Sequence, residues 1–243
     1  MNQVLIPLKE IIPTANLEGL KTLEEISKMD KSPNRYDWTS PWNWKPATPQ
    51  FFTYSDYFLD AGQSFQGQIV VDLGCGLSLS NYQLARIFEA TAYVGVDKYN
   101  ARDLFDKFQN QIVHEQNQAL RDVEFNLSAR LGKLDGDENA KRLGRNLEAF
   151  LEGNLPNIPA TIVAEDMLDF LKRLPDGSVS ILTGRIDKCL ITDSDDDYAH
   201  EIESEIARAI HPNGSHVSYY SRFEDPQLVS HKMDDDYTRF AKQ

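Results

Sequence analysis

Residues 68–78 read Gln68-Ile-Val-Val-Asp-Leu-Gly-Cys-Gly-Leu-Ser78, and the rest of the chain is organised around this stretch. Its residues 69–71 are apolar and β-branched, which is typical of a strand buried on both faces. Asp72 ends the apolar run. Gly74 and Gly76 then predict a tight turn, in which the backbone can approach a ligand closely.

A helix is predicted directly after the glycine turn. Ser78 or Ser80 can cap it, and apolar residues at helical spacing continue to Phe88. A strand, a glycine turn and a helix in this order aim backbone N–H groups at a bound ligand. The stretch therefore predicts a ligand site at the end of its strand.

A second apolar strand is predicted at residues 92–97, Ala-Tyr-Val-Gly-Val-Asp. It ends in a carboxylate, Asp97. A carboxylate at the tip of a second strand can accept two hydrogen bonds from the hydroxyls of a ribose. The pair of strands therefore indicates a nucleoside-containing ligand.

These strands and their ends resemble the class I S-adenosylmethionine-dependent methyltransferases. The first motif of that family is an acidic residue, any residue, Gly, any residue, Gly, and it is matched here by Asp72, Gly74 and Gly76. Ser78 stands where the family usually has a third glycine. The resemblance implies an α/β, Rossmann-like three-layer sandwich. Its sheet would be mostly parallel and seven-stranded, with an antiparallel C-terminal hairpin.

The resemblance also implies S-adenosylmethionine as the cofactor and a set of residues that bind it. The implied residues are Asp72, Gly74, Cys75 and Gly76 in the first turn, Asp97 and Lys98 after the second strand, and Asp166 and Met167 after a third strand. In the family, an acidic residue in the place of Asp166 faces the adenine amino group, and Met167 would be an apolar neighbour of the ring. Glu165 is the alternative acceptor.

Two other interpretations of the glycine turn stay open. An NAD-dependent enzyme would have a small residue at the last position of the Gly-x-Gly-x-x-Gly/Ala fingerprint, where this chain has Leu79. The turn could also belong to an unrelated βαβ unit, in which the glycines serve only the backbone. A non-catalytic protein that keeps the fold and the cofactor is a further alternative.

The remaining elements follow from apolar periodicity and turn residues. The predicted strands are 160–167, 179–186 and 215–221, the predicted helices 168–174 and 198–210, and the closing hairpin pairs 228–233 with 237–241. Residues 61–243 are expected to form the domain that resembles the methyltransferases. Residues from about 100 to 157 exceed one crossover helix and predict a helical insertion, either a scaffold elaboration, a substrate-selecting cap or an oligomer interface.

Residues 1–60 are predicted to form an N-terminal arm with helical and aromatic segments. The arm carries all three tryptophans of the chain, Trp38, Trp42 and Trp44. Its proline-rich middle cannot build a core of its own, so the aromatic rings are expected to pack on the domain, a partner or a ligand. A lid across the pocket mouth is the functional hypothesis.

The tail of the fourth predicted strand is where the family usually places residues near the transferring methyl group. Arg185 and Asp187 could hold a polar substrate there, or form a surface ion pair with Lys188. The Asn/Asp-Pro-Pro-Tyr/Phe motif of amino-methylating nucleic-acid enzymes is missing. No catalytic base is predicted.

No metal site is predicted either. The acidic run 193–197 is explained by the dipole of the helix that it opens, although its oxygen ligands would also suit a divalent cation. The five histidines show no paired zinc spacing.

The net charge of −13 over 243 residues disfavours binding to bulk nucleic acid, so a small-molecule or protein acceptor is expected. No apolar run is long enough to span a bilayer, and no secretory signal is recognised. The two cysteines, Cys75 and Cys189, predict no disulfide framework, so a cytoplasmic location is expected. The sequence does not determine the oligomeric state.

Overall fold

The structure of the chain is a computed structural model. It describes residues 65–75, 80–97, 138–183, 196–219, 227–232 and 237–242. The predicted N-terminal arm, the first part of the helical insertion and the tail of the fourth strand lie outside these residues. So do Gly76, Ser78 and Lys98 of the predicted site.

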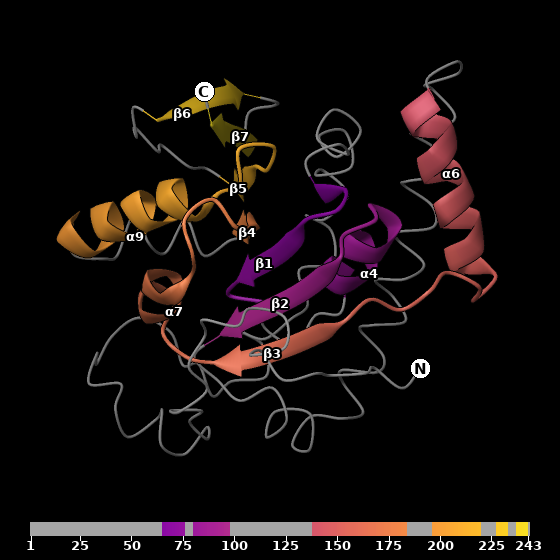
Figure 1. Cartoon of the computed structure of the whole chain (residues 1–243), viewed down its shortest axis with the longest axis horizontal. Coiled ribbons are helices and arrows are strands. Elements are labelled where there is room, and N and C mark those ends of the chain that lie inside the picture. Colours follow the sequence, from indigo (N-terminus) through magenta and orange to yellow (C-terminus); the bar gives the residue numbers. More distant parts are fainter. Residues whose placement is uncertain are drawn as a thin grey trace.

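The strands form one sheet in the order β3-β2-β1-β4-β5-β7-β6 (Figure 1). Their bounds are β1 Ile69–Leu73, β2 Ala92–Asp97, β3 Ala160–Ala164, β4 Ser180–Thr183, β5 His216–Tyr219, β6 Leu228–Lys232 and β7 Tyr237–Lys242. Strands β3, β2, β1, β4 and β5 pair in parallel, whereas β7 is antiparallel to both β5 and β6. This confirms the predicted α/β fold with a mostly parallel sheet and an antiparallel C-terminal hairpin.

The strand order reverses between β1 and β4. The order β3-β2-β1-β4-β5 follows that of doubly wound Rossmann sheets. In such sheets, ligands bind outside the carboxyl ends of the strands, in the crevice where the order reverses. The topology therefore places the ends of β1 and its neighbours at the expected ligand edge.

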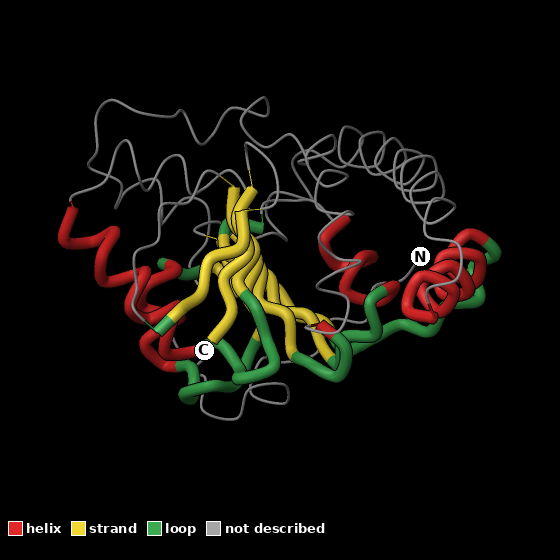
Figure 2. The backbone as a smooth tube through the Cα atoms, turned by 90° about the horizontal axis from the view of Figure 1, so that it is seen from above, coloured by secondary structure: helices red, strands yellow, loops and turns green. Residues whose placement is uncertain are grey.

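Helices cover both faces of the sheet, which gives three layers (Figure 2). On one face lie α7 (Met167–Arg173) and α9 (Asp196–Ala209), and on the other lie α4 (Ser80–Ile87) and α6 (Glu138–Leu151). Each face has its own apolar core with side chains from the sheet and from its two helices. None of the described helices is both long and apolar enough to cross a membrane.

The burial of β1 explains why its sequence is apolar at successive positions. Val71 and Leu73 lie in the core under α7 and α9, and Val70 lies in the core under α4 and α6. A strand buried on both faces requires apolar residues on both. The strand nevertheless continues through Asp72, so it is longer than its apolar run.

The described part of the predicted insertion consists of α6 and the segment that leads from it to β3. Two side chains of α4 hold this segment. Arg86 donates hydrogen bonds to the carbonyls of Leu155 and Pro156, and the Tyr82 hydroxyl donates to the carbonyl of Ile158 over 3.2 Å. These contacts join α4 to the segment that leads into β3.

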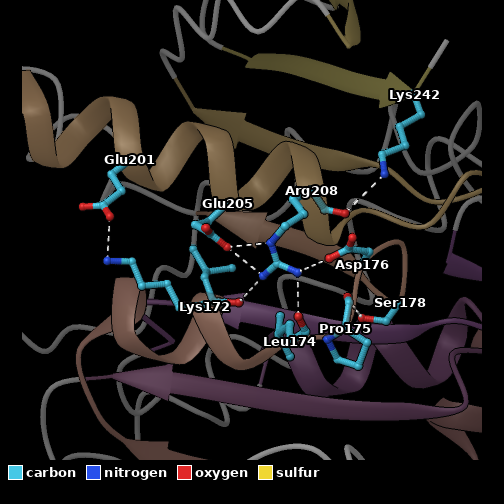
Figure 3. Close-up of polar contacts among 10 residues, drawn as sticks. Lys172, Leu174, Pro175, Asp176, Ser178, Glu201, Glu205, Arg208 and Lys242 are labelled. Atoms are coloured by element: carbon cyan, nitrogen blue, oxygen red, sulfur yellow. Dashed lines mark hydrogen bonds and ion pairs between the residues drawn. The ribbon is translucent and has the colours of Figure 1, made fainter.

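Arg208 joins α9 to the end of α7 (Figure 3). Its guanidinium donates to the carbonyl oxygens of Leu171 and Leu174, over 2.8 and 2.7 Å. It also forms ion pairs with Asp176 at 2.5 Å and with Glu205 at 2.7 Å. The last carbonyls of a helix have few intrahelical donors, so Arg208 acts as a side-chain cap from a neighbouring helix. At the carbonyl of Leu171 it adds a second donor to the N–H of Leu174.

Candidate functional site

The predicted glycine turn follows β1 directly. Gly74 has a φ of 71°, in the left-handed region that glycine adopts most readily. The backbone N–H groups of Gly74 and Cys75 both donate to the carbonyl of Val96, over 2.7 and 3.1 Å. The turn is thereby closed against the end of β2.

Asp72 lies under this turn with only 1% of its surface exposed. The hydroxyl of Tyr93 donates a hydrogen bond of 2.7 Å to Asp72 Oδ2, and Tyr93 is itself buried. Asp72 is in register with Gly95, two residues beyond Tyr93 on the same face of β2, so no side chain at residue 95 separates the two groups. The pKa of Tyr93 is raised well above its usual value by burial and then by the charge of Asp72, which keeps the phenol protonated and able to donate.

Cys75 and Asp97 complete the group at the ends of β1 and β2. Burial raises the pKa of the Cys75 thiol well above its usual value, and the nearby carboxylates of Asp97 and Asp72 raise it further. The thiol is therefore protonated and unsuited to act as a nucleophile. Asp97 is half-buried at the last position of β2. The structure thus brings together Asp72, Gly74, Cys75 and Asp97.

Asp166 lies just after β3, which ends at Ala164 and is shorter than predicted. It is the N-cap of α7, because its Oδ1 accepts from the N–H groups of Leu168 and Asp169, over 2.9 and 3.4 Å. The hydroxyl of Tyr198 in α9 lies 3.1 Å from Oδ1 and 3.0 Å from Oδ2. The contact of Asp166 with an adenine amino group remains a prediction.

Met167 and Glu165 flank this carboxylate. Met167 is buried in the core under α7 and α9, and its predicted contact with an adenine ring stays a prediction. Glu165, the alternative acceptor, forms a two-pronged ion pair with Arg173 at the end of α7. Both of its carboxylate oxygens therefore already have a donor.

Sequence reasoning did not identify Tyr93 or Tyr198 as members of this edge. The period of two in a strand could have identified Tyr93, because it puts residues 93 and 97 on the same face. Tyr198 is the first residue of the helix predicted over 198–210, and no local signal pairs it with Asp166, which lies 32 residues away in sequence.

The acidic run 193–197 holds the oxygen ligands that would best suit a divalent cation. The structure describes the acidic run 193–197 only from residue 196, where α9 begins. Among the described residues, no group of three or more His, Cys, Asp or Glu side chains is placed to hold a metal ion.

The mostly parallel sheet and its antiparallel C-terminal hairpin are those that the resemblance to class I methyltransferases implies. No protein-family model and no curated protein matches the chain.

Several solved structures resemble the chain. One is PKMT2 from Rickettsia typhi in complex with AdoHcy, at 15% identity and a TM-score of 0.37 over 70% of this chain. Another is the complex between the Haloferax volcanii Trm112 methyltransferase activator and a methyltransferase, at 16% identity and 0.38 over 74%. A third is geranyl diphosphate methyltransferase in complex with SAM, at 15% identity and 0.35 over 72%.

The matches span 25, 57 and 52% of those three chains, respectively. Likenesses of this kind do not transfer an activity to the present chain. The function proposed below therefore depends on the residues at the carboxyl edge of its own sheet.

Proposed function

We propose that this protein binds S-adenosylmethionine at the carboxyl ends of β1, β2 and β3 and transfers its methyl group to a small-molecule or protein acceptor. The observation that supports the proposal most directly is the left-handed Gly74 turn, closed against the end of the strand that carries Asp97. Both lie at the edge where doubly wound sheets bind their ligands.

The residues present suit such a ligand. Asp97 offers carboxylate oxygens, which can accept from the two hydroxyls of a ribose. Gly74 has no side chain, so the backbone of the turn can approach a ligand closely. Asp166 offers acceptor oxygens at the end of the next strand, where an adenine amino group would be a suitable donor.

The cofactor supplies a methyl group that its sulfonium already activates. The chain must therefore bind the cofactor, align an acceptor with it and exclude water. In this proposal Asp97 holds the ribose, Asp166 orients the base, and Asp72 supports the glycine turn with Tyr93 as its donor. A general base is required only for an acceptor that is protonated in the complex, and no residue is assigned to that role.

The acceptor class follows from charge. With a net charge of −13, the protein repels a phosphate backbone, so the proposal favours a small molecule or a protein side chain over bulk nucleic acid. A non-catalytic protein with the same cofactor is separated from an enzyme by turnover, because only an enzyme forms S-adenosylhomocysteine when an acceptor is supplied.

Calorimetry on the full chain tests the cofactor directly. Asp97→Ala should weaken binding of S-adenosylmethionine and S-adenosylhomocysteine by about 1–3 kcal/mol, the usual range for leaving buried donors without an acceptor. Glu148→Ala is the matched control, because it removes one carboxylate from the exposed side of α6.

Three results would contradict the proposal. Folded wild-type protein that binds neither compound lacks the cofactor site. Binding of a nicotinamide dinucleotide instead would indicate the NAD-dependent alternative. Equal affinity of Asp97→Ala and wild type would mean that the ribose is held elsewhere.

A further inference from the structure

The carboxylate of Asp166 is held from two different helices. From α7, the N–H groups of Leu168 and Asp169 donate to Oδ1, over 2.9 and 3.4 Å. From α9, the hydroxyl of Tyr198 lies 3.1 Å from Oδ1 and 3.0 Å from Oδ2. A carboxylate fixed by donors on two elements has little freedom to change its rotamer.

Asp166 keeps acceptor capacity despite these contacts. An ionised carboxylate has about four lone-pair sites on its two oxygens. Within the described part of the chain, Oδ2 of Asp166 accepts only from Tyr198. Asp166 is half-buried, so part of its surface stays exposed at the edge of the sheet.

Glu165 differs from its neighbour in this respect. The guanidinium of Arg173, the last residue of α7, donates to both oxygens of Glu165 and forms an ion pair with it. An amino group that approached Glu165 would have to compete with a charged, two-pronged donor. Asp166 is therefore the better acceptor of the two acidic residues that follow β3.

Tyr198 is itself fixed in place. It lies in the first turn of α9, is partly buried, and packs its ring against the core under α7 and α9. Burial and the charge of Asp166 raise the pKa of Tyr198 above its usual value. Its hydroxyl consequently stays protonated and serves Asp166 as a donor.

We infer that Tyr198 is a positioning residue for base recognition: it holds Asp166 in the one orientation that presents Oδ2 to the amino group of an adenine. This inference rests on the proposed function, because it names the part of the ligand that Asp166 receives. Preorganisation of this kind strengthens a hydrogen bond by removing the entropy cost of ordering the acceptor. It also creates specificity, because a base with a carbonyl in place of the amino group would face the carboxylate with a second acceptor.

The test compares two ligands by calorimetry: S-adenosylhomocysteine and S-inosylhomocysteine, which has a carbonyl where adenine has its amino group. Wild-type protein should bind the adenosyl compound about 10-fold more tightly or better, because the inosyl compound leaves Asp166 without its donor. Tyr198→Phe, which keeps the ring, should weaken the adenosyl compound by about 3- to 10-fold and leave the affinity for the inosyl compound unchanged.

Two further variants make the comparison specific. In an Asp166→Asn background, Tyr198→Phe should have no additional effect on either ligand, because the group that it positions has been altered. Tyr82→Phe is the matched control. It removes a tyrosine hydroxyl that bonds to the carbonyl of Ile158 on the opposite face of the sheet, and it should leave both affinities unchanged.

Several outcomes would overturn the inference. If Tyr198→Phe binds the adenosyl compound as well as wild type does, the hydroxyl does not position Asp166. Tighter binding would mean that the hydroxyl competes with the base, and equal weakening of both ligands would indicate a purely structural role. Equal affinity of wild-type protein for the two compounds also refutes the inference. This result needs no variant, so the inference can be tested even if Tyr198→Phe does not fold. Wild-type protein that binds neither compound refutes the proposed function as well.

Discussion

His216 lies in the middle of the sheet, where β5 is paired with β4 on one side and with β7 on the other. Its side chain is fully buried, and its ring stacks on that of Phe240 with 5.6 Å between the centroids. Burial lowers the pKa of His216 from 6.5 to about 3. Protonation of this imidazole in mild acid should therefore lower the stability of the fold.

The sign of the effect follows from the protons bound in each state. Between pH 6.5 and pH 3, the unfolded chain carries a protonated His216 and the folded protein a neutral one. Acidification over this window therefore favours the unfolded state, and the full contribution to stability is present only above about pH 6.5. Between pH 7 and pH 5, the lost free energy of unfolding is about 2 kcal/mol, worked from the two pKa values.

The assay is urea unfolding of the full chain at pH 7 and at pH 5, followed by far-UV circular dichroism. Tryptophan emission is unsuitable, because all three tryptophans precede the residues that the structure describes. His216→Phe preserves an aromatic ring against Phe240 and removes the titration. This variant should lose about 2 kcal/mol less than wild type between the two pH values.

The quantity compared is the change in the free energy of unfolding between pH 7 and pH 5. Any destabilisation by the substitution that is the same at both pH values cancels in this comparison. His200→Gln is the control, since His200 is an exposed residue of α9 with 79% of its side chain accessible. If wild type and His216→Phe lose the same free energy between pH 7 and pH 5, the buried imidazole does not control the acid response and the reasoning is refuted.

Three further predictions concern Tyr93, Arg208 and the N-terminal arm. Tyr93→Phe removes the donor to buried Asp72, so the free energy of unfolding in urea should fall by about 1–3 kcal/mol. Calorimetry should show a weaker affinity for S-adenosylhomocysteine, and unchanged values in both assays would mean that the contact is dispensable. Arg208→Met removes the donor to the end of α7 and should lower the free energy of unfolding by about 1–2 kcal/mol without changing cofactor affinity. Lys172→Ala breaks an exposed ion pair and should leave stability nearly unchanged, so equal effects of the two substitutions would argue against the cap. A variant that begins near residue 60 should keep its circular dichroism spectrum and its cofactor affinity but lose acceptor turnover, and normal turnover would rule out a lid.

Much of the fold could be predicted because it depends on local patterns. The β-branched run at residues 69–71 reads as a strand buried on both faces, and the structure places it between two apolar cores. Gly74 predicts a tight turn, and its φ of 71° lies in the left-handed region that residues with a side chain rarely adopt. Asp97 was placed correctly at the end of its strand for the same reason, because apolar runs and their polar ends are visible in a single stretch of chain.

The boundaries of the third strand were less accurate. The sequence predicts a strand over 160–167, but β3 ends at Ala164 and Asp166 begins α7 as its N-cap. An acidic residue after an apolar run is compatible with the end of a strand and with the start of a helix. The end of a strand and the start of a helix are distinguished only by the backbone N–H groups that donate to the carboxylate, and the sequence does not show them.

The sequence by itself determined the class of the fold, the glycine turn and the carboxylate of Asp97 at the end of the second strand. The tertiary structure alone decided which side chains meet at that edge: Tyr93 with Asp72, and Tyr198 with Asp166. These partners lie 21 and 32 residues apart in sequence and belong to different elements. Periodicity tells which face of a strand or helix a residue occupies, but the neighbour that it meets depends on how the elements pack, and packing depends on the whole chain.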